Sequence, residues 1–282
     1  MPRRTKESEE LTLVLGPEHQ AQGQFDEGAL TEQKMIGFSG EGSTINRLGP
    51  LYYWAWGCVH RPGATVPLHP HRGFEIFSYL LAGSLEHRDS LGHRSVLHAG
   101  GLQLMQTGSG LEHEEEFLNI PGAGLQIWLD PDFRRQIEEP PRFSTFSDTD
   151  FLRLDAKGAK LSNWDKSLTH RKLILGPQSP VVLQTPEVLM EDLWLAPQQR
   201  IERESLPLRA WSAIVLEGKG TWRVRGHERS MQRGDYLVLQ TSAESHKSEI
   251  FSGEDGLHLV WIEVPVNPPY QLFPKPRGGK RS

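Results

Sequence analysis

Residues 75–101 read EIFSYLLAGSLEHRDSLGHRSVLHAGG and give the clearest sign of the fold class. Three short runs, 75–81, 84–88 and 94–97, are each followed by glycine or by the turn-forming sequence Asp-Ser-Leu-Gly. Runs of this length at intervals of about ten residues are typical of strands in a β-sandwich or β-barrel. The 28 glycines and 20 prolines continue this punctuation along the chain. We therefore predict an all-β fold.

The chain is long enough for two domains. Its 282 residues allow two cores of ordinary size. Amphipathic helical patterns are scarce, and the stretch 130–139, followed by Pro140 and Pro141, is where we expect a helical turn and the start of an inter-domain connection. We predict an N-terminal barrel over residues 1–140 and a C-terminal barrel over residues 141–282, ending in a short basic tail from Lys275.

An internal repeat supports two similar barrels. The same turn spacing recurs about 134 residues later, so that Gly100 falls opposite Gly234 and residues 105–107 fall opposite residues 239–241. We expect Glu204 and Leu206 to stand opposite His69 and His71, and these two residues cannot supply two imidazoles. We therefore expect the second barrel to lack a metal.

Composition limits the function classes. The chain is 37% hydrophobic and 24% charged, and no segment approaches the roughly 20 apolar residues that span a bilayer. The charged sequence MPRRTKESEE at the N-terminus does not resemble a secretory signal. The single cysteine, Cys58, agrees with a reducing compartment, and the net charge of −5 argues against direct nucleic-acid binding. We expect a cytoplasmic protein with no membrane segment.

Two sequence segments carry metal-ligand chemistry. Residues 63–75, GATVPLHPHRGFE, place His69 and His71 at positions i and i+2, and residues 108–115, GSGLEHEE, place His113 and Glu115 in the same relation. On a strand, alternate residues share one face. If both segments line one barrel, three neutral imidazoles and one carboxylate converge on a single ion. This donor set suits Fe(II), Mn, Co, Ni or Zn, and the sequence alone leaves the choice among them open.

These residues resemble the pirin family of the cupin superfamily. The similar segments are residues 69–75, 79–83, 86–92, 107–115 and 124–128, within a region of specific similarity from about 60 to 145 and a weaker cupin likeness to about 265. The resemblance implies two cupin-type β-barrels, with a metal in the N-terminal barrel and a degenerate C-terminal barrel. It also implies His69, His71, His113 and Glu115 as ligands and iron as the metal.

A second carboxylate competes for the ligand role. In many other cupins the glutamate at the position of Glu75 is the oxygen ligand, whereas the pirin resemblance favours Glu115. We expect Glu115 to be the ligand and Glu75 to have a structural hydrogen-bonding role.

The resemblance leaves two classes of function open. Some bacterial pirins resemble flavonol 2,3-dioxygenases, which implies an oxidoreductase acting on a quercetin-like flavonol or a related small enolic aromatic, with Glu115 as the catalytic base. The alternative is a non-catalytic, redox-responsive regulator that binds a protein partner such as a transcription factor. A storage or isomerase-like cupin is a third alternative. We expect a monomer or a homodimer.

Overall fold

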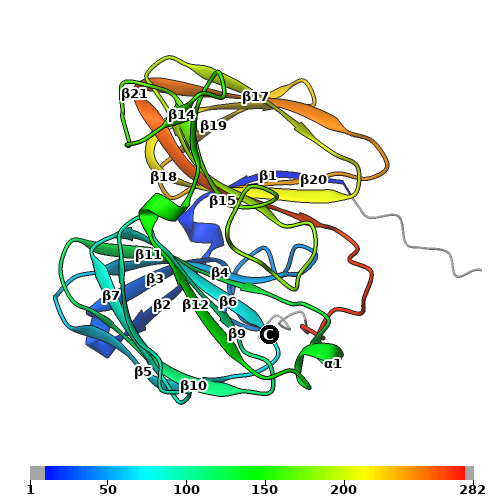
Figure 1. Ribbon diagram of the computed structural model, residues 1–282. Coiled ribbons are helices and arrows are strands. Elements are labelled where there is room, and N and C mark those ends of the chain that lie inside the picture. The colour runs from blue at the N-terminus through cyan, green and yellow to red at the C-terminus, as the bar shows by residue number, and fades with distance from the viewer. Residues whose placement is uncertain (1–9, 277–282) are drawn as a thin grey trace, which may run out of the picture. The chain divides into compact units, whose positions relative to one another are not determined.

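The computed structural model describes residues 10–276, in two compact units. One unit, here called the first barrel, comprises residues 18–151, 180–186 and 268–276. The other, called the second barrel, comprises residues 10–17, 152–179 and 187–267. The predicted basic tail begins at Lys275, and its residues after Pro276 lie outside the described part. Figure 1 shows the two units with their strands labelled.

The first barrel is built from two antiparallel sheets. The larger has the strand order β12-β9-β6-β11-β4-β3-β2, and the smaller has the order β5-β10-β7-β8. The strands are β2 (Ala21–Phe25), β3 (Leu30–Ile36), β4 (Leu51–Val59), β5 (Ala64–His71), β6 (Glu75–Ala82), β7 (Ser84–Asp89), β8 (Arg94–His98), β9 (Leu102–Gln106), β10 (Leu111–Phe117), β11 (Gly122–Leu129) and β12 (Arg142–Phe146). The short helix α1 (Phe133–Gln136) and two 3₁₀ turns, η2 (Asp26–Gly28) and η3 (Asp148–Asp150), complete it, and η1 (Pro17–His19) precedes β2.

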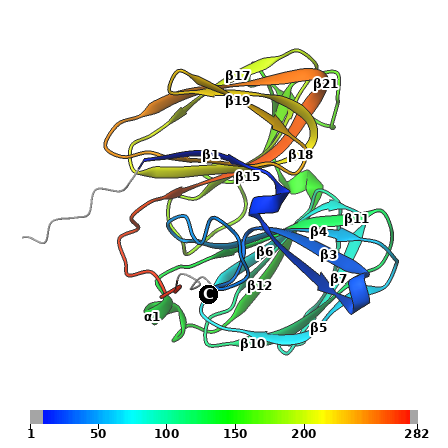
Figure 2. The ribbon, with the colours of Figure 1, turned by 180° about the vertical axis from the view of Figure 1, so that it is seen from behind.

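The second barrel repeats this plan with two very long strands. Its strand order is β1-β20-β18-β21-β16-β15-β13-β14, with β17 paired to β21 and β19 paired to β18. The strands are β1 (Leu11–Leu15), β13 (Arg153–Asp155), β14 (Lys160–Leu161), β15 (His170–Leu175), β16 (Leu189–Leu195), β17 (Arg200–Ser205), β18 (Arg209–Val224), β19 (His227–Gln232), β20 (Tyr236–Gln240) and β21 (His246–Pro265). Figure 2 shows β18 and β21 curving through this unit.

The structure confirms the predicted all-β fold. The runs 75–81, 84–88 and 94–97 form β6, β7 and β8, and the expected helical turn within 130–139 is α1. Each barrel has its own apolar core: Leu80, Leu85 and Phe117 are among the core residues of the first, and Trp222 and Leu259 are among those of the second. In residues 10–276, no helix has the length and hydrophobicity needed to cross a membrane.

The internal repeat is confirmed at the level of single hydrogen bonds. Thr107 accepts a bond at Oγ1 from the backbone N–H of Phe74, and Thr241 accepts the corresponding bond from Arg209, each at 2.9 Å. Gly83 and Gly218 both turn the chain with positive φ, +82° and +81°, and a Cβ on either would come within 2.8 Å of a backbone oxygen. The same backbone constraint therefore selects glycine in both barrels.

The strand that corresponds to β5 presents different residues from those predicted. Glu204 and Leu206 are exposed, whereas Ser205 is fully buried and Arg203 is directed inward onto the ring of Trp261. The pairing of β17 with β21 has a regular register, unlike the pairing of β5 with β10. The offset of 134 residues that relates Gly100 to Gly234 places Arg203 and Ser205 opposite His69 and His71, so the expected pair lies one residue too far along the chain and faces outward.

Candidate metal centre

Three imidazoles meet where β5 pairs with β10. His69 lies directly opposite His113 in the strand register, and His71 follows two residues after His69. The ring centroids of the three are 4.4–4.9 Å apart, and one nitrogen from each lies within 4.8 Å of the others. Strand alternation thus brings all three predicted histidines together.

Ring nitrogens of this cluster face one another at short distances. The Nδ1 of His69 is 2.7 Å from the carbonyl oxygen of Pro67, so it carries the proton and leaves Nε2 as the lone-pair atom. The Nε2 atoms of His71 and His113 are 3.1 Å apart. Three neutral imidazoles whose nitrogens lie this close together could offer their lone pairs to one cation.

Burial keeps two of the rings neutral. Burial, with a smaller contribution from the neighbouring His69, lowers the pKa of His71 to about 3. Burial also lowers the pKa of His113 strongly, with additional contributions from His69, His71 and His87. A divalent metal requires the deprotonated nitrogen, so these environments preserve the ligand form over the whole physiological pH range.

Glu115 lies on the same strand but in a second group. Its carboxylate, 4% exposed, belongs with His113 and His87, whose ligand atoms are also within 4.8 Å of one another. Oε1 accepts hydrogen bonds from Ser78 and Gln103. Burial raises the pKa of Glu115 to about 7 against the effect of those bonds. The two groups share His113, and the strand register shifts between His113 and Glu115.

Glu75 is occupied by structural hydrogen bonds. Its Oε1 accepts from the side chain of Gln106 at 2.9 Å and from the backbone N–H of Gln184 at 2.6 Å. Its Oε2 accepts from both the N–H and the hydroxyl of Thr185, at 2.8 and 2.6 Å. Four donors satisfy most of the lone pairs of one carboxylate, and Glu75 belongs to neither histidine group.

Sequence reasoning missed His87 and Asp89. His87 is fully buried on β7, with its Nδ1 3.4 Å from Nδ1 of His113 and its Nε2 3.1 Å from Oδ2 of Asp89. The signal was present, because His87 and Asp89 stand at i and i+2 in a strand, the same spacing that identified the two ligand pairs.

Aromatic rings support the imidazoles. Trp128 packs edge-on against His71 with a centroid separation of 4.7 Å, and Phe143 stacks on His87 at 4.1 Å with an interplanar angle of 7°. Large rigid side chains in contact with the histidines restrict their rotamers.

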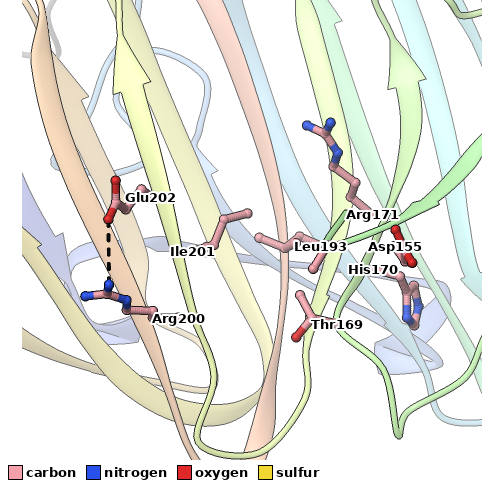
Figure 3. A pocket seen from close by; sticks show the side chains of 9 residues that line it. Asp155, Thr169, His170, Arg171, Leu193, Arg200, Ile201 and Glu202 are labelled. Atoms are coloured by element: carbon pink, nitrogen blue, oxygen red, sulfur yellow. Dashed lines mark ion pairs between the residues drawn. The ribbon is translucent and has the colours of Figure 1, made fainter. Parts of the chain in front are cut away.

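Two cavities differ in their relation to this cluster. One of about 40 Å³ lies inside the first barrel, with Ser78, Glu115 and Gln126 among its lining residues. A larger one, of about 440 Å³, belongs to the second barrel (Figure 3) and has Leu193 and Ile201 in its lining. None of the residues of the two candidate metal groups lines the larger cavity, so the larger volume does not coincide with the candidate metal centre.

Comparisons with known proteins place the chain in a family. The family model described as Pirin matches residues 53–129. A pirin-like protein of Arabidopsis thaliana, At1g50590, is 30% identical over 225 residues, which cover 74% of this chain and 68% of that protein.

Solved structures share the fold. A quercetin 2,3-dioxygenase from Acinetobacter baumannii superposes with a TM-score of 0.72 at 18% identity, over 95% of this chain and 91% of the other. The bacterial pirin YhhW from Escherichia coli, in complex with nickel(II), gives 0.68 at 16% identity, over 90% and 99% of the two chains. With the two-barrel fold, the paired histidine strands and a relative matched over two thirds of its length, the chain belongs to the pirin family.

Proposed function

We propose that this protein is a metal-dependent dioxygenase acting on a quercetin-like flavonol or a related small enolic aromatic compound. The observation that supports the proposal is a cluster of three imidazoles that shares His113 with the buried carboxylate of Glu115. A metal centre next to a carboxylate that can accept a proton is what deprotonation of an enolic hydroxyl needs. The quercetin 2,3-dioxygenase of A. baumannii shares the fold.

The proposed ligands are His69, His71, His113 and Glu115. The three imidazoles supply nitrogens that already face one point, and Glu115 lies beside His113 on the same strand. Glu75 is assigned a structural role instead, because four hydrogen bonds occupy its carboxylate.

We propose Fe(II) as the ion. Three nitrogens and one oxygen also suit nickel, cobalt, manganese and zinc, and the E. coli pirin YhhW binds nickel(II). Iron is favoured because the pirin resemblance implies it, and a ferrous ion with four protein ligands keeps two further coordination positions.

The residues of the chain have distinct parts in the proposed reaction. The bound ion would supply Lewis acidity toward the substrate hydroxyl and the redox chemistry for its oxidation. The carboxylate of Glu115, held at Oε1 by Ser78 and Gln103, would accept the hydroxyl proton. His69 is the least buried of the three histidines, so substrate is expected to approach from its side. The buried faces of His71 and His113 would exclude water.

Oxygen uptake with quercetin tests the proposal. Protein loaded with ferrous iron under anaerobic conditions should consume dioxygen on addition of quercetin and air. His69→Ala and His113→Ala should lose this activity, while His98→Gln should keep it, because His98 lies on β8 with Ser84 as its partner. No uptake by the iron-, nickel- or cobalt-loaded protein above that of the two alanine variants would refute the dioxygenase.

A Glu115→Gln variant tests the role of Glu115 as proton acceptor while keeping the size of the side chain in the fold. Glutamine keeps the size and one acceptor oxygen but loses the base, so kcat should fall by about 10²–10⁴-fold. Metal content, measured on the same sample, shows whether the loss comes from the base or from the ligand role. Unchanged kcat would remove Glu115 from the mechanism.

A further inference from the structure

We propose that Asp89 and His87 are positioning residues that fix the tautomer and orientation of His113. The inference rests on the proposed metal centre and adds to it two residues that are not ligands. Residues behind a metal-binding histidine commonly set which ring nitrogen carries the proton, and with it the strength of the metal bond.

The three side chains form a buried line across β7 and β10. Asp89 lies opposite His113 in the strand register, and His87 lies opposite Glu115. Nδ1 of His113 is 3.4 Å from Nδ1 of His87, and Nε2 of His87 is 3.1 Å from Oδ2 of Asp89. The rings of His87 and His113 and the Asp89 carboxylate are all fully shielded from solvent.

The carboxylate of Asp89 determines the direction of the hydrogen bonds between Asp89 and His87 and between His87 and His113. An ionised carboxylate only accepts, so Nε2 of a neutral His87 carries its proton and Nδ1 is a lone-pair atom. That lone pair accepts from Nδ1–H of His113. The remaining nitrogen of His113, Nε2, is then a lone-pair atom, and it is the one that lies 3.1 Å from Nε2 of His71. The line therefore presents the metal-binding nitrogen of His113 to the cluster.

Further contacts hold Asp89 and His87 in place. Oδ1 of Asp89 accepts from the backbone N–H groups of Leu91 and His93, each at 3.0 Å. The ring of Phe143 lies flat on His87. With Nε2 bonded to Asp89 and one ring face covered, His87 has its Nδ1 left for His113. This arrangement favours a supporting role for His87 over a ligand role, although its atoms lie close to Glu115.

An Asp89→Asn variant should reverse the direction of both hydrogen bonds between residue 89 and His113 while keeping the size and shape of the side chain. The amide of asparagine can donate to Nε2 of His87, which then carries its proton on Nδ1 and forces the proton of His113 onto Nε2, toward the ion. We expect the affinity for Ni²⁺ or Co²⁺ to fall by about 10–100-fold, measured by competition with a chromophoric chelator. The visible absorption spectrum of the Co²⁺ form should shift as well, because the bond from His113 changes.

Two further variants separate positioning from packing. His87→Phe keeps the stack with Phe143 but removes both hydrogen bonds, and it should weaken metal binding as Asp89→Asn does. His98→Gln, on the neighbouring strand β8, should leave affinity within about twofold of the wild type, since it contacts none of the three residues. Lowered thermal stability with unchanged affinity and an unchanged Co²⁺ spectrum would overturn the proposal.

The wild-type protein gives an independent result. Nitrogen-15 NMR of the histidine rings in the metal-free protein should place the protons on Nε2 of His87 and Nδ1 of His113. The opposite tautomers would overturn the positioning role even if the variants do not fold. A wild type that binds none of Fe²⁺, Ni²⁺, Co²⁺ or Zn²⁺ would instead refute the metal centre, so the two failures are distinguishable.

Discussion

The two barrels share a plan but handle charge in opposite ways. On β5 and β10 the first barrel gathers imidazoles that burial keeps neutral. On the corresponding β17 the second barrel carries Arg203, whose guanidinium bonds Glu263 at 2.6 Å and lies 3.5 Å from the ring centroid of Trp261. Glu263 also accepts from Arg209 at 3.0 Å. The first barrel gathers neutral imidazoles at this position, whereas the second barrel pairs a buried carboxylate with arginines of the same chain.

The second barrel neutralises its buried carboxylate within the chain. A buried carboxylate without a partner is costly, and Glu263 is compensated by two arginines from the same chain. The imidazoles of the first barrel are neutral and carry no charge that needs a partner, and their closely spaced nitrogens are the groups that the proposed ion would bind. The predictions below test each side of this contrast.

The largest effect is expected from removing a ligand histidine. His71→Ala or His113→Ala should lower the affinity for Ni²⁺ by more than the roughly 10–100-fold expected of a supporting residue. Isothermal titration with chelator competition measures it. Arg203→Met in the second barrel is the matched control and should bind one ion as the wild type does. Binding that survives in both alanine variants would contradict the assignment.

The next effect concerns stability in the second barrel. Arg203→Met leaves Glu263 buried with only Arg209, and it should lower the free energy of unfolding toward the lower end of about 3–5 kcal/mol. Urea denaturation measures the change. Adding Glu263→Gln should recover part of the loss, because the buried charge disappears with its partner. A loss below about 1 kcal/mol, as for an exposed ion pair, would contradict this prediction.

Lowering the pH should reduce the stability of the metal-free first barrel, because its buried histidines stay neutral in the folded state. The folded pKa of His71 is about 3 and the unfolded value is about 6.5, so the unfolded chain binds the proton first and stability falls as pH drops below 6.5. One such group contributes a slope of about 1.4 kcal/mol per pH unit. Glu115 acts oppositely, because its raised pKa lets the folded state take up a proton first below pH 7. His71→Gln should therefore show a shallower fall between pH 6.5 and 4.5 in urea titrations, and identical slopes would contradict the depressed pKa.

The smallest effect is expected at the apparent counterpart of His113. His246 falls near the matching position of the repeat, yet its Nε2 contacts Glu10 at 3.2 Å and no metal-ligand group includes it among the described residues. His246→Gln should change the free energy of unfolding by no more than about 0.5 kcal/mol and leave metal affinity unaltered. A measurable loss of bound metal would mean that the second barrel holds ligands after all.

The sequence predicted the strands and the histidines because both depend on short-range patterns. Turn glycines ended the runs correctly at β6 to β8, and alternation placed His69 and His71 together. Sequence reasoning missed what depends on pairing between distant strands. His87 and Asp89 join the site because β7 pairs with β10, and the hydrogen-bonding role expected for Glu75 is filled by Thr185, 110 residues away. The expected pair Glu204 and Leu206 is one residue out of alignment with the first barrel, so the inward position of Arg203 was missed.

The shift of register between His113 and Glu115 limits how such a centre could be transplanted. Opposite this point, Val66 and His69 pair with Glu115 and His113, so β5 contributes two intervening residues where β10 contributes one. The equivalent strands of the second barrel run without any offset. Installing histidines there by point substitution would reproduce the donor types but not their spacing. A working copy would need an inserted residue, which makes the irregular step in the ladder as much a part of the centre as the imidazoles themselves.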